Sequence, residues 1–316
     1  MRGLFLKERT LMELVALGTG AASPTLERNV AAYALLRLGE ILLFDCGEGT
    51  QVQFAKAKLS MYKVSKIFIT HLHGDHFYGL IPFLTTLQLN KRTTPLEIYG
   101  PKGLREYIDF MKRISQVGFQ YDLKITEIDE EFEGGIIFEN SEYVVKAMPL
   151  LHRIFVLGYS LEEKEKPGHF NNELAEELGI PSGPIRGEIK NGATVTLENG
   201  AVVTPEMIIG DPIKGKKVTY CTDTLYYKNS IELANESDLL IHEGTFDPDE
   251  LEKAQQTKHA TSLQAALVAK ESNSKNLLIT HISSRYVGAN RNLIKKGIAE
   301  VFPDFTIAKD LMRVKI

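Results

Sequence analysis

The stretch His71-Leu72-His73-Gly74-Asp75-His76 decides the fold, because it places four metal-binding side chains within six positions. It follows the apolar run Ile67–Ile69, which has the composition of a buried strand, and glycines mark the turn after that strand. On an extended chain, the first two histidines and the aspartate would point to one side and the last histidine to the other. We therefore expect one loop at a strand end to serve two neighbouring metal ions.

The donor types in this stretch indicate the kind of metal site. Imidazole and carboxylate ligands without a thiolate favour zinc, or a similar borderline ion, in an open catalytic site rather than in a closed structural one. The alternative is a solvated polar loop. We consider it the weaker explanation, because four ligand side chains in six positions at a strand end are costly for a turn.

The composition predicts a soluble globular protein of the cytoplasm. The 316 residues are 43% hydrophobic and 25% charged, which is typical of such proteins. No apolar run approaches the roughly 18–20 residues that span a bilayer, and the charged stretch Lys7–Arg9 argues against a signal peptide. Cys46 and Cys221 are expected to be buried free thiols. The net charge of −4 argues against a broad basic surface for nucleic acid.

Apolar runs alternate with helical patterns along most of the chain and predict a layered α/β sandwich. Strands are expected at residues 12–17, 33–38, 41–44, 66–70, 96–99, 123–128, 143–147, 218–221, 239–242 and 277–280, and helices at 101–115, 263–270 and 293–301. Residues 162–217 differ, because glycine and proline are dense there. We expect a protruding arm with one short helix near 173–178 and little core; the alternative is a tolerated surface insertion.

Three further candidate ligands follow apolar runs elsewhere in the chain. They are His152, Asp223 and His281, and the last repeats the order of apolar run, threonine and histidine found at His71. A lone histidine at a strand end is more often a structural residue than a ligand. Two metal ions need more ligands than one loop supplies, however, and a short carboxylate such as Asp223 can bridge them. We therefore expect all three beside the His71 cluster.

Several motifs together give the chain a resemblance to a known family. They are Leu17-Gly18-Thr19-Gly20 with Pro24, Arg28 and Asn29; Phe44-Asp45-Cys46-Gly47-Glu48; Asp223-Thr224; His242-Glu243-Gly244-Thr245; Thr280-His281-Ile282-Ser283-Ser284-Arg285-Tyr286; and the arm's Pro167-Gly168 and Gly183-Pro184. With the histidine cluster, the chain resembles the metallo-β-lactamase superfamily and, within it, the ribonuclease Z family of tRNA 3′-processing endonucleases. The resemblance implies a single αβ/βα four-layer domain over residues 1–316, with residues 162–217 inserted as a flexible arm that binds tRNA.

The resemblance also implies a metal site with two zinc ions per subunit. One ion would be held by His71, His73 and His152, the other by Asp75, His76 and His281, with Asp223 bridging both. Asp45 would orient a ligand histidine, although its position also fits the cap of a helix or turn.

The chemistry implied is cleavage of the 3′ trailer from precursor tRNA, which leaves a 3′-OH on the tRNA. Two zinc ions lower the pKa of a shared water toward about 7, so that hydroxide can attack the phosphodiester. Asp75 would accept a proton from the nucleophile. His259, held by Glu243, would protonate the departing ribose oxygen. A surface position for His259, before a helix that starts near Thr261, is an equally good interpretation of the sequence.

Substrate and partner follow from the resemblance as well. Binding of precursor tRNA would involve Arg28, Asn29 and Arg285 and, in the arm, Gly183, Pro184, Arg186 and Lys190, and the protein would be a homodimer. The arm holds seven basic and ten acidic side chains, a net charge of −3, so contact with RNA would be local. Two alternatives stay open: a small-molecule hydrolase of the same fold (phosphodiesterase, thioesterase or lactonase) and a binding scaffold without catalysis.

Overall fold

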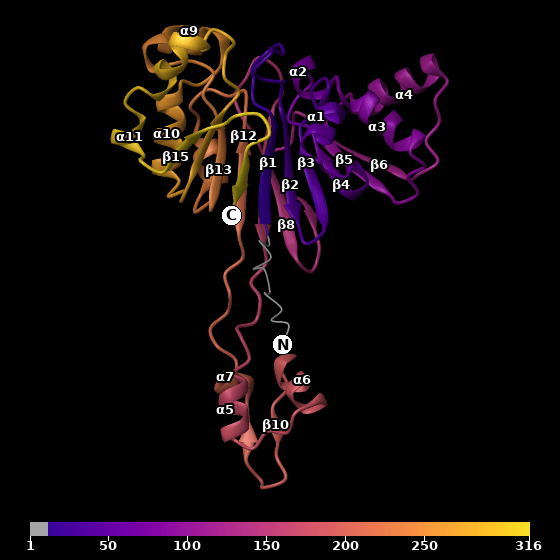
Figure 1. The fold of residues 1–316 in the computed structure, drawn as a ribbon, viewed down its shortest axis with the longest axis vertical. Coiled ribbons are helices and arrows are strands. Elements are labelled where there is room, and N and C mark those ends of the chain that lie inside the picture. The colour runs from indigo at the N-terminus through magenta and orange to yellow at the C-terminus, as the bar shows by residue number, and fades with distance from the viewer. Residues whose placement is uncertain (1–11) are drawn as a thin grey trace, which may run out of the picture. The chain divides into compact units, whose positions relative to one another are not determined.

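The computed structural model describes residues 12–316 and divides them into two compact units. The larger unit comprises residues 12–139, 145–161 and 217–316, and the smaller unit comprises residues 140–144 and 162–216. Figure 1 shows two sheets with helices in the larger unit and short helices in the smaller one. The smaller unit therefore contains all but the last residue of the predicted arm, together with residues 140–144.

The first sheet is mixed, with the strand order β16-β1-β2-β3-β4-β5-β6. Its strands are β1 (Met12–Gly18), β2 (Ala32–Arg37), β3 (Glu40–Phe44), β4 (Val64–Phe68), β5 (Leu96–Pro101), β6 (Leu123–Ile128) and β16 (Arg313–Lys315). β3 to β6 run parallel, whereas β1, β2 and β16 pair antiparallel. Parallel strands end at one edge of the sheet, so the loops after β3 and β4 emerge together.

The second sheet has the order β15-β14-β13-β12-β9-β8-β7. Its strands are β7 (Gly135–Glu139), β8 (Tyr143–Pro149), β9 (Leu157–Glu163), β12 (Lys217–Cys221), β13 (Leu239–Glu243), β14 (Leu277–Thr280) and β15 (Phe305–Ile307). β12 to β15 are parallel, and their register pairs Glu243 with Thr280. The residues that follow β13 and β14 are therefore neighbours.

Aromatic side chains join the two sheets face to face. Phe44 of β3 lies 6.0 Å from Tyr220 of β12, and Phe68 of β4 lies 5.5 Å from Tyr159 of β9, measured between ring centroids. Such pairs add to the stabilisation from apolar burial. The sandwich is thus closed between its sheets, and the ends of its parallel strands remain available for a site.

Helices form the outer layers. On the first sheet they are α1 (Thr50–Lys56), α2 (Gly74–Phe77), α3 (Leu80–Leu89) and α4 (Leu104–Ser115). On the second they are α8 (Lys228–Ala234), α10 (Ser262–Glu271) and α11 (Ile298–Val301), with α9 (Leu251–Thr257) nearby in the chain. Figure 1 shows the two helical layers outside the paired sheets. This arrangement confirms the predicted αβ/βα four-layer sandwich.

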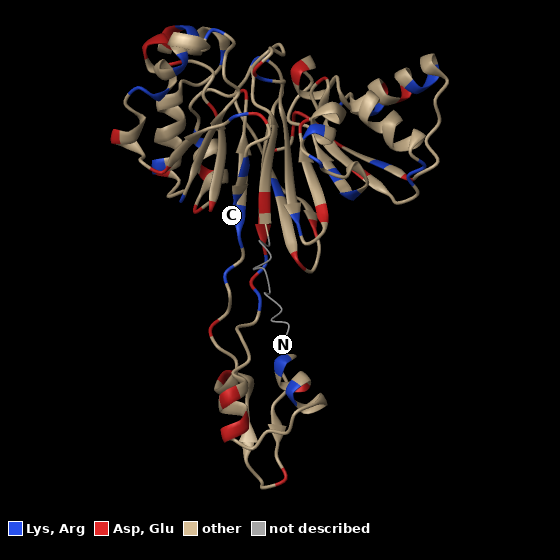
Figure 2. Cartoon of the chain, viewed as in Figure 1, with Lys and Arg blue, Asp and Glu red and all other residues tan. Residues whose placement is uncertain are grey.

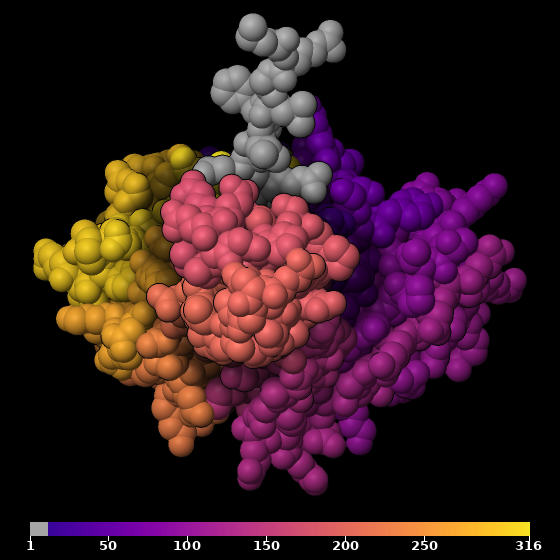
Figure 3. Space-filling model, turned by 90° about the horizontal axis from the view of Figure 1, so that it is seen from below, coloured from indigo at the N-terminus to yellow at the C-terminus, as the bar shows by residue number. Residues whose placement is uncertain are grey.

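The arm forms a small core of its own. It contains α5 (Asn172–Glu177), α6 (Pro184–Lys190), α7 (Pro205–Ile208) and a hairpin of β10 (Val195–Thr196) and β11 (Val202–Val203). Six buried apolar side chains meet between them: Ala175, Ile180, Ile189, Leu197, Val203 and Ile208. Figure 3 shows the arm's atoms packed closely together. The prediction of one helix was wrong, because the glycines and prolines end three short helices and a hairpin, whose apolar residues converge on a core that is small, as expected.

Two predicted helices have different bounds. The helix expected from Pro101 begins at Leu104, because Pro101 is the last residue of β5. The helix expected over 293–301 is divided into a 3₁₀ helix, Gly288–Lys295, and α11, with Gly297 in a left-handed conformation between them (φ 70°). Cys46 and Cys221 are buried free thiols, as predicted. Within residues 12–316, no helix combines the length and apolarity that crossing a membrane would require.

Candidate metal centre

The predicted metal ligands all follow strands of the two sheets. The histidine-rich stretch follows β4, His152 follows β8, Asp223 follows β12 and His281 follows β14. These ends meet because β3, β4 and β5 are parallel in one sheet and β12, β13 and β14 are parallel in the other. Side chains more than 200 positions apart in the chain thereby become neighbours, and their donor atoms form two groups.

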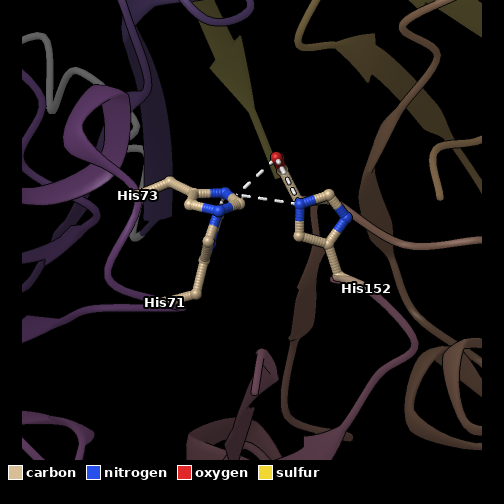
Figure 4. A group of neighbouring side chains, drawn as sticks. His71, His73 and His152 are labelled. Atoms are coloured by element: carbon tan, nitrogen blue, oxygen red, sulfur yellow. Dashed lines mark hydrogen bonds and ion pairs between the residues drawn. The ribbon is translucent and has the colours of Figure 1, made fainter. Parts of the chain in front are cut away.

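The first group consists of His71, His73, His152 and Asp223. His73 Nδ1 lies 3.0 Å from His71 Nε2 and 3.3 Å from His152 Nε2. Asp223 Oδ2 lies 3.6 Å from His71 Nε2 and 3.7 Å from His152 Nε2. Figure 4 shows the three rings turned toward one another.

The second group consists of Asp75, His76 and His281, with the other oxygen of Asp223 beside it. The Nε2 atoms of His76 and His281 are 3.3 Å apart, and each lies 3.4 Å from Asp75 Oδ2. Each also lies 3.2 Å from Asp223 Oδ1. Asp223 thus directs one oxygen at each group, which is the arrangement that a bridging carboxylate needs.

The expected direction of Asp75 was wrong. We predicted from an extended chain that it would share a side with His71 and His73, but α2 begins at Gly74 and turns this part of the chain into a helix. Asp75 therefore faces His76 and His281 instead. A helix of four residues is too short to produce a periodic signal in the sequence.

The donor geometry fits metal ions. Four rings direct Nδ1 at a fixed acceptor: His71 at Thr70 Oγ1 (3.0 Å), His76 at Asp45 Oδ2 (2.7 Å), His152 at the Lys258 carbonyl (2.7 Å) and His281 at Thr245 Oγ1 (3.0 Å). Their Nε2 atoms are thereby left as lone-pair donors. Zinc–nitrogen bonds of about 2.0–2.1 Å put tetrahedral ligands about 3.3 Å apart, close to the separations observed. Neutral rings in this arrangement would repel, whereas a cation between them would bind both.

The pKa shifts of the histidines also favour metal binding. Burial lowers the pKa of His71, His73 and His152, which keeps these rings neutral and able to bind a metal. Burial also opposes a charge on His76, but the carboxylates of Asp223, Asp45 and Asp75 outweigh it and raise the pKa of His76. The excess of negative charge that favours a proton on His76 would also favour a divalent cation.

Asp45 holds His76 from behind. It is fully buried directly after β3, and its Oδ2 accepts from His76 Nδ1 at 2.7 Å and from the Tyr220 hydroxyl at 2.8 Å. Its Oδ1 accepts from the backbone N–H of Thr70 at 2.8 Å. Of the two roles considered for Asp45, the structure supports the orientation of a ligand histidine, since Gly49 is the residue that precedes α1.

His259 belongs to the same site rather than to the outer surface. Its Nδ1 lies 3.0 Å from Glu243 Oε1, and its ring stacks on His281 with centroids 5.5 Å apart. The buried Glu243 also accepts from the Thr224 N–H and the Thr245 hydroxyl, both at 2.6 Å. Burial lowers the pKa of His259, but the Glu243 carboxylate outweighs burial and raises this pKa to about 9.

A cavity of about 460 Å³ opens over these groups. It is lined by Ala21–Ser23, His73–Asp75, His152, Arg153, Asp223, Thr245, Phe246, Thr257, His259, His281, Ser283 and Ser284. A larger cavity of about 550 Å³ beside Leu72 and Phe155 contains none of the candidate ligands, so we place the site in the smaller one. Arg153 was not predicted, because it stands in a loop without a pattern of its own, and the two serines belong to a motif that was quoted for the resemblance but were given no role.

The predicted substrate residues of the body have partners within the protein. The Arg28 guanidinium donates to Thr19 Oγ1 and to the Ala308 carbonyl, at 2.5 and 2.7 Å. Asn29 donates to the Glu48 carbonyl at 2.9 Å. Arg285 pairs with the Glu250 carboxylate at 2.7 Å. None of the three lines the cavity, and in this structure they hold the surrounding loops.

The predicted substrate residues of the arm lie on or beside α6. Gly183 and Pro184 begin this helix, and Arg186 donates to the Ile180 carbonyl at 2.9 Å. Lys190 Nζ lies 4.9 Å from the centroid of the Phe170 ring. Figure 2 shows acidic positions in red along α5 and both basic and acidic positions on α6. Two of the arm's seven basic residues therefore lie on α6, within an arm that is acidic as a whole.

The fold and the paired ligand groups define a metallohydrolase of the metallo-β-lactamase class. The chain is similar to the metallo-β-lactamase fold protein YhfI from Bacillus subtilis (TM-score 0.66, 18% identity, 96% of this chain and 98% of that one). It is also similar to human tRNase Z, short form (TM-score 0.69, 30% identity, 96% and 99%). A family model described as Anti-Pycsar protein Apyc1 matches residues 12–150.

Curated relatives identify the family within that class. Ribonuclease Z of Synechocystis sp. is 42% identical over 310 residues, which cover 96% of this chain and 94% of the relative. Ribonuclease Z of Ligilactobacillus salivarius is 44% identical over 304 residues, 95% of each. The chain belongs to the ribonuclease Z family. Family, fold and enzyme class are as the sequence motifs predicted.

Proposed function

We propose that the protein is a zinc-dependent endoribonuclease that removes the 3′ trailer from precursor tRNA and leaves a 3′-OH on the tRNA. The observation that carries the proposal is the pair of ligand groups sharing Asp223, with the His259–Glu243 pair facing the same cavity. Membership of the ribonuclease Z family and the likeness to human tRNase Z over nearly the whole chain support this substrate.

Two zinc ions per subunit are the cofactor we propose. His71, His73 and His152 would hold one ion, Asp75, His76 and His281 the other, and Asp223 would bridge them. Nitrogen and oxygen donors without a thiolate suit a catalytic zinc site. When bound, the pair of ions would supply Lewis-acid stabilisation of the phosphodiester and an acidified water.

The side chains around the cavity would move the protons. The pKa of Asp75 is lowered, because His76 and His281 outweigh the opposing effect of burial, so this carboxylate stays ionised and can accept a proton from the attacking water. His259, with a pKa raised to about 9, is protonated at neutral pH and can donate to the departing ribose oxygen. Glu243 would hold the ring for this transfer.

We further propose that the arm, residues 162–217, binds precursor tRNA and that the protein acts as a cytoplasmic homodimer. The half-buried Arg186 and the exposed Lys190 on α6 suit local contact with phosphates. Light scattering of the purified protein would measure the mass, and a single-chain mass of about 35.4 kDa would contradict the dimer.

Cleavage of a 3′-extended precursor tRNA, with the cut site mapped, tests the function directly. The proposal predicts one cut near the end of the acceptor stem, lost on chelation of zinc and in Asp75→Ala. A chain that hydrolyses a small phosphodiester or thioester rapidly but cuts no precursor would instead be a small-molecule hydrolase of this fold.

A further inference from the structure

Two buried threonines occupy matching positions in the two halves of the site. Thr70 stands two residues after β4 of the first sheet, and Thr245 stands two residues after β13 of the second. Thr70 Oγ1 lies 2.9 Å from Asp45 Oδ1 and 3.0 Å from His71 Nδ1. Thr245 Oγ1 lies 2.6 Å from Glu243 Oε2 and 3.0 Å from His281 Nδ1. Each hydroxyl therefore stands between one buried carboxylate and one candidate metal ligand.

Proton counting fixes the direction of these hydrogen bonds. A threonine hydroxyl carries one proton, and an ionised carboxylate can only accept. Each hydroxyl must therefore donate to its carboxylate, and its lone pair is left to accept from the histidine Nδ1–H. A ring whose Nδ1 carries the proton has an unprotonated Nε2. In both histidines that nitrogen is the one directed at the neighbouring ligands.

Each carboxylate also accepts a hydrogen bond directly from a second histidine. Asp45 accepts from His76, which belongs to the second ligand group. Glu243 accepts from His259, the candidate proton donor. The two halves thus repeat one pattern, in which a carboxylate holds one histidine directly and another through a threonine. In the second half, this pattern ties a metal ligand to the proton donor.

We propose that Thr70 and Thr245 are positioning residues that hold His71 and His281 as Nδ1-protonated rings, so that each threonine governs the retention of the metal ion in its own ligand group. Thr245 in addition links that retention to the His259–Glu243 pair, and this last part rests on the proposed function. Neither threonine would bind a metal ion itself, because its hydroxyl contacts the Nδ1 side of the histidine ring and the ion would bind at Nε2.

The expected effect is on metal affinity. Thr70→Val and Thr245→Val keep the shape of the side chain but remove the hydroxyl, which takes one of several donors from the carboxylate and leaves the histidine Nδ1–H without its acceptor. Loss of such a partner behind a ligand histidine lowers metal affinity by about 10–100-fold. Thr70→Ser and Thr245→Ser retain the hydroxyl and should bind zinc nearly as the wild type does.

Zinc titration of the metal-free full chain against a chromophoric chelator measures the two stepwise affinities. His71→Ala and His281→Ala would identify which step belongs to which group, and each valine variant should weaken the step of its own group. Thr219→Val is the matched control, because Thr219 is a buried threonine bonded to Ser237 Oγ at 2.7 Å and its hydroxyl contacts no ligand histidine. Should a valine variant not fold, the alanine variant removes the same hydroxyl without placing a methyl group against the carboxylate.

Valine variants that bind both zinc ions as the wild type does would overturn the proposal. So would serine variants as weak as the valine ones, because packing would then explain the loss. The titration uses no RNA, so a protein that passes it but cuts no precursor tRNA contradicts only the proposed function. At saturating zinc, Thr245→Val should also cut precursor more slowly than Thr70→Val, and equal rates would remove the link to His259.

Discussion

The cavity and the arm both use charged residues, but the cavity buries them and the arm keeps them near the surface. In the cavity, charged groups are buried and paired with fixed partners: Asp223 is 2% exposed, and Glu243 is completely buried. In the arm, the basic groups of α6 lie near the surface, around a core of only six buried apolar side chains. Chemistry at a phosphodiester needs charges that are held before the substrate arrives, whereas contact with RNA needs charges that can reach it. This difference fits the proposal that the body carries out catalysis and the arm binds the RNA.

The largest effect is expected from Asp223→Ala, which removes the carboxylate shared by both ligand groups. Cleavage of precursor tRNA and hydrolysis of a small phosphodiester should both fall, by about 10³-fold or more, and the zinc content of the purified protein should drop. Metal analysis and the two assays measure this. Asp211→Ala in the exposed part of the arm is the control and should retain its zinc; full zinc content in Asp223→Ala would contradict the assignment.

His259→Ala should slow hydrolysis by an amount that depends on the leaving group of the substrate. Loss of a general acid costs about 10²–10⁴-fold when the departing oxygen needs a proton, so cleavage of precursor tRNA should slow by that amount. A diester that releases 4-nitrophenolate needs no such proton, and its hydrolysis should change much less. Equal losses on both substrates would mean that His259 holds the site together rather than donating a proton.

The pH dependence of cleavage tests the His259–Glu243 pair. Because the pKa of His259 is raised to about 9, its proton is present below that pH, and the rate should fall as the pH rises through about 9. The same shift stabilises the fold below the unfolded pKa of His259, and this contribution is lost as the pH rises through about 9. In Glu243→Gln the falling limb should move to lower pH, because the charge that raises the pKa is gone. If the falling limb of the pH profile does not move in Glu243→Gln, the ionisation belongs to a group other than His259.

A small effect is expected in the arm. Lys190→Ala removes one exposed charge from α6, so precursor tRNA should bind a few-fold more weakly and the salt dependence of binding should decrease by about one phosphate contact. Hydrolysis of a small phosphodiester should not change. Glu176→Ala on α5 is the matched control and should not weaken binding. If Lys190→Ala leaves the salt dependence of binding unchanged, Lys190 does not contact a phosphate of the RNA.

The metal ligands could be predicted from the sequence more completely than the conformation of the loops around them. Apolar runs followed by histidine or aspartate mark the ends of buried strands, and parallel strands bring such ends together, so His152, Asp223 and His281 could be named in advance. The resemblance to a known family added their grouping and the His259–Glu243 pair. The turn of α2 that redirects Asp75 is too short to leave a periodic signal.

Contacts between distant segments were the least predictable part. Thr70 and Thr245 hold their histidines by hydrogen bonds that depend on the exact register at the strand ends, and composition carries no trace of them. The hydrogen bond of Arg28 to the Ala308 carbonyl was not predicted either, because the two residues lie 280 positions apart in the chain. The residues of the arm's small core were not predicted, because they are scattered among breakers and meet only in three dimensions.

Removal of the arm is the most direct test of the proposal that the body carries out catalysis and the arm binds the RNA. The backbones of Glu163 and Lys216 are hydrogen-bonded at 2.9 Å, so a short Gly-Ser turn can join them and replace the residues between. The measurement is kcat/KM of this variant on precursor tRNA and on a small phosphodiester, side by side with the wild type. We predict a large loss on precursor tRNA, mainly through KM, with the small substrate hydrolysed as before. An equal loss on both substrates would contradict the account, because the arm would then be part of the catalytic centre.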